Sequence, residues 1–246
     1  VFERLHFLMG FEDMLVNFLL EPEDMMDLCN AIGEYRFQLT KLIVDNLHPD
    51  IILSHDDWGS KQSLFISPDT WREFIKPQYE RSYKYMKDHG VIIMHHADSF
   101  MEPIIEDMVD LGIDIWQGTL PQNDIPKLQK QLNGRMTLMG GIDASIVDRV
   151  DSTEEEIRKE VRRACEEYAP HGHFIPCITY GGPGCLFPHV DSIILSLKCL
   201  CPKVERIEPF QIVMKRKNTF CKFASSVIKS SCIMYLASDI NSDNHC

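Results

Sequence analysis

The sequence predicts an α/β fold of the (β/α)8 TIM-barrel type, on three observations from residues 1–198. Short apolar segments alternate with longer segments of helical periodicity, which is typical of βα units. Each apolar segment is continuous, as expected of strands buried on both faces of a parallel sheet. Each also ends on polar or ionisable side chains, and barrel enzymes place their catalytic groups at the C-terminal ends of the strands.

Five segments have this strand pattern, and the helices between them carry boundary signals. The predicted strands are residues 51–57, 91–98, 113–117, 136–143 and 173–180. Proline and two acidic residues should open a helix over residues 22–44, because these residue types favour the first turn. Ser-Pro-Asp should open another over residues 67–88. Ser152 and Glu155 have the spacing of a capping box for a helix over residues 157–168.

Strand–helix alternation also fits an open, doubly wound sheet. No GxGxxG fingerprint or phosphate loop follows any of the five predicted strands, which favours the barrel. A whole barrel has eight strands in about 250 residues. Because the chain begins with Val1 rather than Met, we expect a fragment that holds about the C-terminal five βα units.

Composition and charge exclude several classes of protein. The 246 residues are 44% hydrophobic and 25% charged, as in an ordinary globular domain. The sequence contains no apolar run of about 18 residues that would predict a membrane span, and no signal-peptide pattern. The net charge of −12 argues against a general nucleic-acid binder. The nine cysteines are irregularly spaced, which indicates reduced thiols and a cytoplasmic location.

The composition changes near residue 198. Residues 199–246 hold seven Lys or Arg against four Asp or Glu, a net charge of +3 in a chain whose total is −12. This tail also holds five of the nine cysteines and lacks a clear amphipathic period. We therefore predict a partial barrel over residues 1–198 and a distinct tail over residues 199–246 that is not part of it.

Two pairs of adjacent polar residues follow the first two predicted strands, Asp56-Asp57 and His95-His96, and Asp98 comes soon after the second pair. Neighbouring side chains on a strand point to opposite faces. We therefore expect one residue of each pair to face the mouth of the barrel and the other to face elsewhere. The carboxylates could act as bases or bind substrate, or they could cap loops. The histidines could carry protons or bind metal, or one could be a core residue.

The later predicted strands carry further candidates. They are Gln117, Asp143, Cys177 and Tyr180, the last of which precedes a glycine-rich turn. A cysteine thiolate can bind zinc, and a tyrosine hydroxyl can donate a hydrogen bond to substrate.

Five motifs, taken in order, resemble the uroporphyrinogen decarboxylase family, which includes the cobamide-dependent methyltransferases. They are DDWG at residues 56–59, ISPDTWREFIKP at 66–77, VIIMHHAD at 91–98, LGID at 111–114 and GGID at 140–143. The resemblance covers roughly residues 2–195. It implies a (β/α)8 barrel, in agreement with the strand pattern.

The resemblance implies two alternative activities. The decarboxylases act on uroporphyrinogen or a related tetrapyrrole without a cofactor, and they have a histidine on the last strand where this chain has Tyr180. The methyltransferases bind zinc through a His-x-Cys on the middle strand and a cysteine on the last, and the zinc activates a thiol that takes a methyl group from a cobamide. Here His95 matches the histidine, Ala97 stands at the first cysteine, and Tyr180 or Cys177 stands at the second.

From these observations we assign site roles as expectations. Asp57, His95 and Tyr180 are assigned to catalysis; Asp56, Gln117 and Asp143 to substrate binding; and His95, His96, Asp98 and Cys177 to an altered metal site, with zinc the expected ion.

The sequence pattern of the DDWG and ISPD segments favours the methyltransferase-like branch, with a cobamide as methyl carrier and a corrinoid protein as partner. The alternatives are a cofactor-free carboxy-lyase acting on a tetrapyrrole, and an inactive remnant that lacks a complete mouth.

Overall fold

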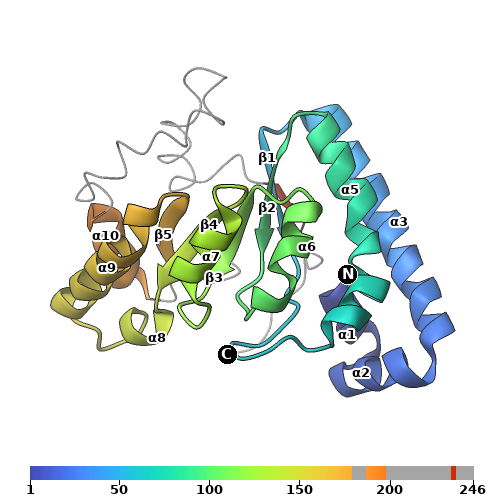
Figure 1. Cartoon of the computed structure of the whole chain (residues 1–246), viewed down its shortest axis with the longest axis horizontal. Helices are drawn as coiled ribbons and strands as arrows, with labels where there is room; N and C mark the ends of the chain where they lie inside the picture. Colours follow the sequence, from blue (N-terminus) through green and yellow to red (C-terminus); the bar gives the residue numbers. More distant parts are fainter. Residues whose placement is uncertain (179–186, 198–233, 237–246) are drawn as a thin grey trace. The chain divides into compact units, whose positions relative to one another are not determined.

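The computed structural model describes residues 1–178, 187–197 and 234–236 (Figure 1). The chain divides into two compact units. The first is Val1–Asp114 with the strand at Met234–Leu236, and the second comprises the described residues from Ile115 onward. No helix among the described residues is both long and apolar enough to cross a lipid bilayer.

The first unit begins with three helices and continues with two parallel strands. The helices are α1 (Phe2–Met9), α2 (Phe11–Leu20) and α3 (Pro22–Leu47). Strand β1 (Ile51–His55) pairs in parallel with β2 (Ile92–His96), in a register that runs from Ile51 opposite Ile92 to His55 opposite His96. A short strand from the tail, β6 (Met234–Leu236), pairs in parallel with the other edge of β1. It is the only described part of the tail, so the boundary near residue 198 stays a prediction.

The helical segment between β1 and β2 is interrupted by a π-helical turn. A single helix was expected over residues 67–88, and the structure instead has α4 (Pro68–Thr70), a π-helical turn (Trp71–Ile75) and α5 (Pro77–Asp88). The wider turn is closed by the Lys76 N–H, which donates to the Trp71 carbonyl at 3.0 Å. Pro77 explains the interruption, because proline has no N–H to donate and its ring crowds the preceding turn.

Two helices flank β2 along the chain, and a shared carboxylate links the segments around them. Helix α5 precedes β2, and α6 (Ile105–Asp110) follows it after a 3-10 turn. Asp107 of α6 accepts hydrogen bonds from Arg72 Nε at 3.0 Å and from Lys76 Nζ at 2.8 Å. This carboxylate therefore ties the segment before α5 to the helix after β2.

The second unit holds three parallel strands. They are β3 (Ile115–Thr119), β4 (Thr137–Ile142) and β5 (Phe174–Ile178), with β4 between the other two. The helices that follow are α7 (Ile125–Leu132), α8 (Ala144–Val147), α9 (Glu154–Tyr168) and α10 (Pro188–Leu197). All five predicted strands are present, each followed by a helix, which confirms the α/β fold built of βα units.

The capping box of α9 lies one residue later than predicted. Thr153, not Ser152, is the N-cap; its hydroxyl accepts from the Glu156 N–H, and the Glu156 carboxylate accepts from the Thr153 N–H at 2.8 Å. The Ser152 hydroxyl instead donates to the Arg149 carbonyl at 2.9 Å. Both hydroxyl residues have a glutamate three positions on, so only the path of the loop decides which of them caps the helix.

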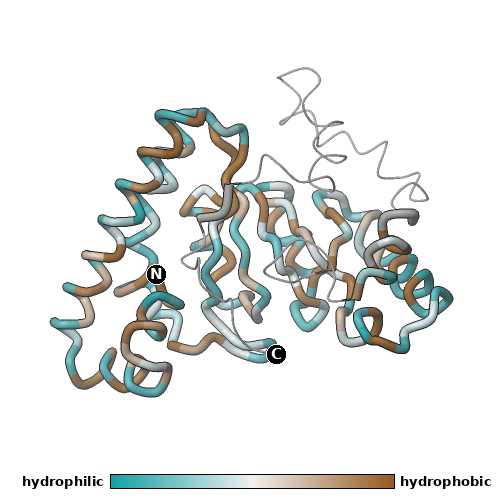
Figure 2. Tube along the Cα trace, turned by 180° about the vertical axis from the view of Figure 1, so that it is seen from behind, coloured by the Kyte–Doolittle hydropathy of each residue, from teal (hydrophilic) through white to brown (hydrophobic). Residues whose placement is uncertain are grey.

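Each unit buries its strands in an apolar core. In the first unit Ile52, Ile93, Trp58 and Trp71 are fully buried, and in the second Trp116 and Leu138 are. Figure 2 shows hydrophobic stretches along the strands and a mixture of hydrophobic and hydrophilic residues along α3. This buried packing holds the strands in place and so fixes the positions of the residues at their ends.

Candidate functional site at the ends of β1 and β2

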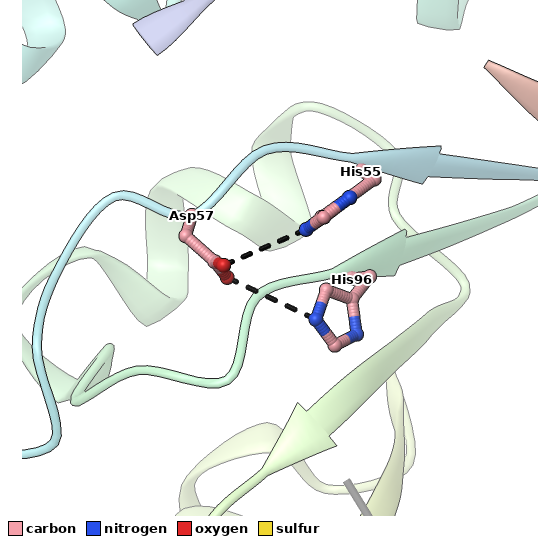
Figure 3. Close-up of side chains that lie close together, drawn as sticks. All are labelled: His55, Asp57 and His96. Atoms are coloured by element: carbon pink, nitrogen blue, oxygen red, sulfur yellow. Dashed lines mark ion pairs between the residues drawn. The ribbon is translucent and has the colours of Figure 1, made fainter. Parts of the chain in front are cut away.

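The C-terminal ends of β1 and β2 bring two histidines and an aspartate together. The parallel register sets His55 directly opposite His96, and Asp57 lies two residues beyond His55, on the same face of the chain. His55 Nε2 is 3.5 Å from Asp57 Oδ2, and His96 Nε2 is 3.9 Å from Asp57 Oδ1 (Figure 3). The two imidazole rings lie 4.6 Å apart, nearly perpendicular. We call these three residues the His–Asp–His cluster.

The cluster is partly shielded from solvent. The side chain of His96 is 1% exposed, that of His55 22% and that of Asp57 26%. One donor atom from each residue lies within 4.8 Å of the other two, and among the described residues no other group of three metal-binding side chains meets this condition. The geometry therefore suits a small cation or a polar substrate group.

The charges around the cluster favour an ionised Asp57. Burial alone would raise the pKa of Asp57, but the close contact with His55 and the charge of His96 outweigh burial and lower that pKa. Burial would lower the pKa of His55, but its close contact with Asp57 and the charge of Glu3 raise it. The cluster thus combines an ionised carboxylate with two imidazole rings.

Two further carboxyl groups border the cluster. Glu3 Oε2 of α1 lies 3.8 Å from His55 Nε2, and the Asp98 N–H donates to Asp57 Oδ1 at 2.9 Å. Burial, helped by the negative charge of Asp56, raises the pKa of Glu3 to about 7. Burial and the charge of Asp57 raise the pKa of Asp98 to about 6. Carboxyl groups are therefore crowded at this end of the strands, and burial favours the protonated forms of Glu3 and Asp98.

The other member of each adjacent pair lies on the opposite face, toward α3 and α5. His95 is fully buried, stacks on the Trp58 ring at 4.1 Å, and its Nδ1 is 2.7 Å from the Tyr83 hydroxyl of α5. Burial lowers the pKa of His95 to about 3, so the ring is neutral. The structure therefore groups His96, not His95, with Asp57, and His95 has the environment of a core histidine.

Asp56 is a buried hydrogen-bond acceptor on the same face as His95. It accepts from the N–H groups of Phe2 and Glu3 at 2.8 and 2.9 Å, from Trp58 Nε1 at 2.8 Å and from the Tyr79 hydroxyl at 2.6 Å. Its side chain is 1% exposed. These contacts dock the first turn of α1 on the end of β1, a structural role for a residue that was expected to bind substrate.

The remaining sequence candidates belong to the second unit or lie outside the described residues. Gln117 is buried on β3. Asp143 caps α8, since its carboxylate accepts from the Ser145 N–H at 2.9 Å. Cys177 is half-buried on β5, and its Sγ donates to the Ile178 carbonyl at 2.9 Å. Tyr180 lies outside the described residues, so its catalytic role stays a prediction.

Sequence reasoning missed two residues of this region. His55 could have been found, because a histidine two positions before Asp57 must share its face of the strand. Glu3 gave no such signal, because only the packing of α1 against β1 brings it within reach of His55.

Comparison with known proteins shows the family of the chain. Residues 2–181 match the sequence model of uroporphyrinogen decarboxylase (URO-D). Uroporphyrinogen decarboxylase from Chlorobaculum tepidum is 30% identical over 154 residues, which cover 61% of this chain and 40% of that protein. The enzyme of the same name from Chlorobium phaeobacteroides is 27% identical over 163 residues, which cover 65% of this chain and 43% of that protein. The chain thus spans less than half the length of these curated relatives.

A solved structure supports the fold class. The methyltransferase from Methanosarcina mazei matches with a TM-score of 0.57 and 18% sequence identity, over 75% of this chain and 51% of that chain. At this identity the likeness concerns the fold alone, and it agrees with five βα units of an incomplete TIM-barrel type. The family match over residues 2–181 carries the assignment: the chain belongs to the uroporphyrinogen decarboxylase family.

Proposed function

We propose that the chain contributes the strand-end site of a methyltransferase-like member of this family, in which a metal ion activates the thiol that accepts the methyl group. The observation that carries the proposal is the His–Asp–His cluster at the C-terminal ends of β1 and β2. Parallel strands of barrel enzymes present their catalytic groups at this end. The face that carries the cluster is turned away from α3 and α5, as the interior of a barrel would be.

The donor set fits a metal ion of the zinc type. Two imidazole nitrogens and a carboxylate oxygen are ligands that zinc accepts, and catalytic zinc sites commonly keep one position open beside three protein ligands. Asp57 is suited to the role because its lowered pKa keeps it ionised near neutral pH. The Asp98 N–H holds Asp57 Oδ1 in place, as outer hydrogen bonds do for metal ligands.

A bound metal of this kind would lower the pKa of an acceptor thiol and so supply a thiolate. In the overall reaction a carbon–sulfur bond replaces the carbon–cobalt bond of a methylated cobamide, the cobalt keeps the electron pair, and the thiol proton is released. The chain's own residues would bind the metal ion and orient the acceptor thiol. His96, almost wholly buried, fixes the inner side of the site, and the more exposed His55 and Asp57 border its open side. The donor would be a cobamide on a corrinoid protein, and a cytoplasmic location stays the prediction from the cysteine pattern.

A second candidate function is decarboxylation of a tetrapyrrole, because the curated relatives bear the name uroporphyrinogen decarboxylase. On this reading the cluster would handle protons and no metal would be required. The two functions differ in their need for metal and in their product, so one experiment separates them.

The test supplies the purified chain with methylcobalamin and 2-mercaptoethanol, and in parallel with uroporphyrinogen III. The proposal expects loss of the methylcobalamin absorbance that depends on added zinc and disappears in His96→Ala, while Asp27→Asn, an exposed substitution on α3, leaves the rate unchanged. Carboxylate loss from uroporphyrinogen in the presence of a chelator would refute it in favour of the second function. A folded chain that is inactive in both assays would refute both and favour the inactive remnant.

A further inference from the structure

Groups outside the His–Asp–His cluster differ in what they could bind. Large apolar side chains are exposed on α1 and α2, but nothing in the structure indicates what covers them. The polar side chains of Asp56 and His95 are buried in the core of the first unit, where no ligand reaches them. The loop after β1 differs from both, because it is exposed, tightly hydrogen-bonded and adjacent to the cluster.

This loop forms a tight hairpin at residues 59–64, which we call the β1 hairpin. Gly59 and Leu64 form an isolated antiparallel bridge. The Ser60 N–H donates to the Ser63 carbonyl at 2.7 Å, and the Ser60 hydroxyl accepts from the Ser63 N–H at 3.2 Å. A Cβ atom on Gly59 would lie 2.6 Å from the Ser63 carbonyl oxygen, so no larger residue fits there without a shift of the backbone. The β1 hairpin therefore holds its tip in a defined position.

The base of the β1 hairpin is fastened to the loop that follows β2. The Ser99 hydroxyl donates to the Gly59 carbonyl at 2.7 Å, and the Phe100 N–H donates to the Ser60 carbonyl at 2.8 Å. Just before them, the Asp98 N–H donates to Asp57 of the cluster at 2.9 Å. The two loops thus lie side by side, and the β1 hairpin borders the cluster at the ends of β1 and β2.

The tip of the β1 hairpin carries a lysine. Lys61 is exposed, and among the described residues its ammonium group has no ion-pair or hydrogen-bond partner. Burial and the charge of Asp57 raise the pKa of Asp98 to about 6, while the positive charges of His55 and Lys61 act in the opposite direction. The ammonium group therefore lies within electrostatic reach of the border of the cluster without being neutralised by a direct ion pair.

The site thus has two poles that differ in chemistry. The cluster would hold a metal ion, which binds the sulfur of an acceptor thiol. Lys61 offers an exposed positive charge beside it, and an ammonium group attracts carboxylate and other anionic groups. A thiol with an anionic group at its other end would contact both poles at once, whereas a neutral thiol would contact only the metal ion.

We infer that Lys61 is a specificity-determining residue, which the β1 hairpin presents to an anionic group of the acceptor thiol while the thiol sulfur binds at the cluster. The inference rests on the proposed function and adds the class of acceptor, a small thiol that carries a carboxylate or a similar anionic group. Lys61 acts on binding and takes no part in bond making or breaking.

The first test measures binding to the zinc-loaded chain with no methyl donor present. Reductive methylation with ¹³C-formaldehyde, carried out before the thiols are added, labels lysine side chains and leaves them cationic; the Lys61 signal is identified by its absence in Lys61→Gln. We expect 3-mercaptopropionate, but not the neutral 2-mercaptoethanol, to shift this NMR signal. Lys84 of α5, which pairs with Asp88, is the internal control and should shift with neither thiol.

The outcomes of this test separate the two proposals. A zinc-loaded chain whose Lys61 signal does not respond to 3-mercaptopropionate, or responds equally to both thiols, would overturn the inference alone. A chain that retains no zinc would overturn the proposed function and the inference together. A selective shift without methyl transfer from methylcobalamin would support the inference and contradict only the proposed reaction.

Methyl transfer from methylcobalamin gives the second measurement. The ratio of kcat/KM for 3-mercaptopropionate to that for 2-mercaptoethanol should fall about fivefold in Lys61→Gln, the most that one exposed ion pair usually contributes, and further in Lys61→Glu. Gly59→Ala should also lower the ratio, because it displaces the β1 hairpin although Lys61 is retained, and Lys84→Gln should leave the ratio as it is. Circular dichroism checks that the variants fold, and an unchanged ratio in both Lys61 variants would overturn the inference.

Discussion

Asp56 offers a quantitative test of how the candidate site is built. Asp56→Asn keeps the size of the side chain but replaces one carboxylate oxygen by an NH2 group. Oδ2 accepts from the Phe2 N–H, Trp58 Nε1 and the Tyr79 hydroxyl, and Oδ1 accepts from the Glu3 N–H. In its better orientation the asparagine keeps its oxygen at the Oδ2 position and turns its NH2 toward the Glu3 N–H.

The cost follows from these contacts. One buried donor left unpaired costs about 1–3 kcal/mol. The other three hydrogen bonds lose their ionic character, which weakens each by about 0.5–1 kcal/mol. We therefore expect Asp56→Asn to lower the free energy of unfolding by about 2.5–6 kcal/mol, a large part of the stability of a typical domain.

The assay is urea unfolding followed by tryptophan fluorescence, which reports on Trp58, Trp71 and Trp116, all of them buried. The midpoint should fall while the slope m stays constant, since the surface exposed on unfolding is the same. Asp27→Asn, on the exposed side of α3, is the control. A loss below about 1 kcal/mol would refute the structural role and return Asp56 to substrate binding.

Three further outcomes are expected. His96→Ala should weaken Zn²⁺ binding at least tenfold, measured by competition with a chromophoric chelator. His95→Gln, at the buried position, should lower the melting temperature and leave metal affinity within a factor of two. The reverse pattern would contradict the placement of His96 in the cluster and of His95 on the face toward α3 and α5. Burial would raise the pKa of Asp107, but hydrogen bonds from its two cationic neighbours lower it below 3.8, so its contribution is present above that pH and is lost as the pH falls through the lowered pKa. Asp107→Asn should therefore cost roughly 1–3 kcal/mol at pH 7 and flatten the decline of unfolding free energy below about pH 4, and a variant with the same pH profile as the unaltered chain would count against this. Burial raises the pKa of the Cys29 thiol to about 12, so peptide mass spectrometry should find Cys29 unmodified by iodoacetamide at pH 8 in the folded chain and modified in urea, and rapid labelling without urea would disprove its burial.

The strands were predictable because a strand buried on both faces leaves a continuous apolar segment in the sequence. Helix starts were less exact. Ser152 and Thr153 satisfy the same capping rule, and the loop path selected Thr153. The π-helical turn before Pro77 depends on how the chain accommodates a missing N–H, which no periodicity records.

Alternation of successive side chains along a strand already required Asp56 and Asp57 to face opposite ways, and likewise His95 and His96. It could not determine which of each pair faces α3 and α5, since alternation is the same in either orientation. Packing decided this: the helix side accommodates a neutral ring stacked on Trp58 and a carboxylate surrounded by donors, so His95 and Asp56 are buried there. Only the tertiary structure could bring His96, His55 and Glu3 to one place, because they are far apart in the sequence and meet through strand register and helix docking.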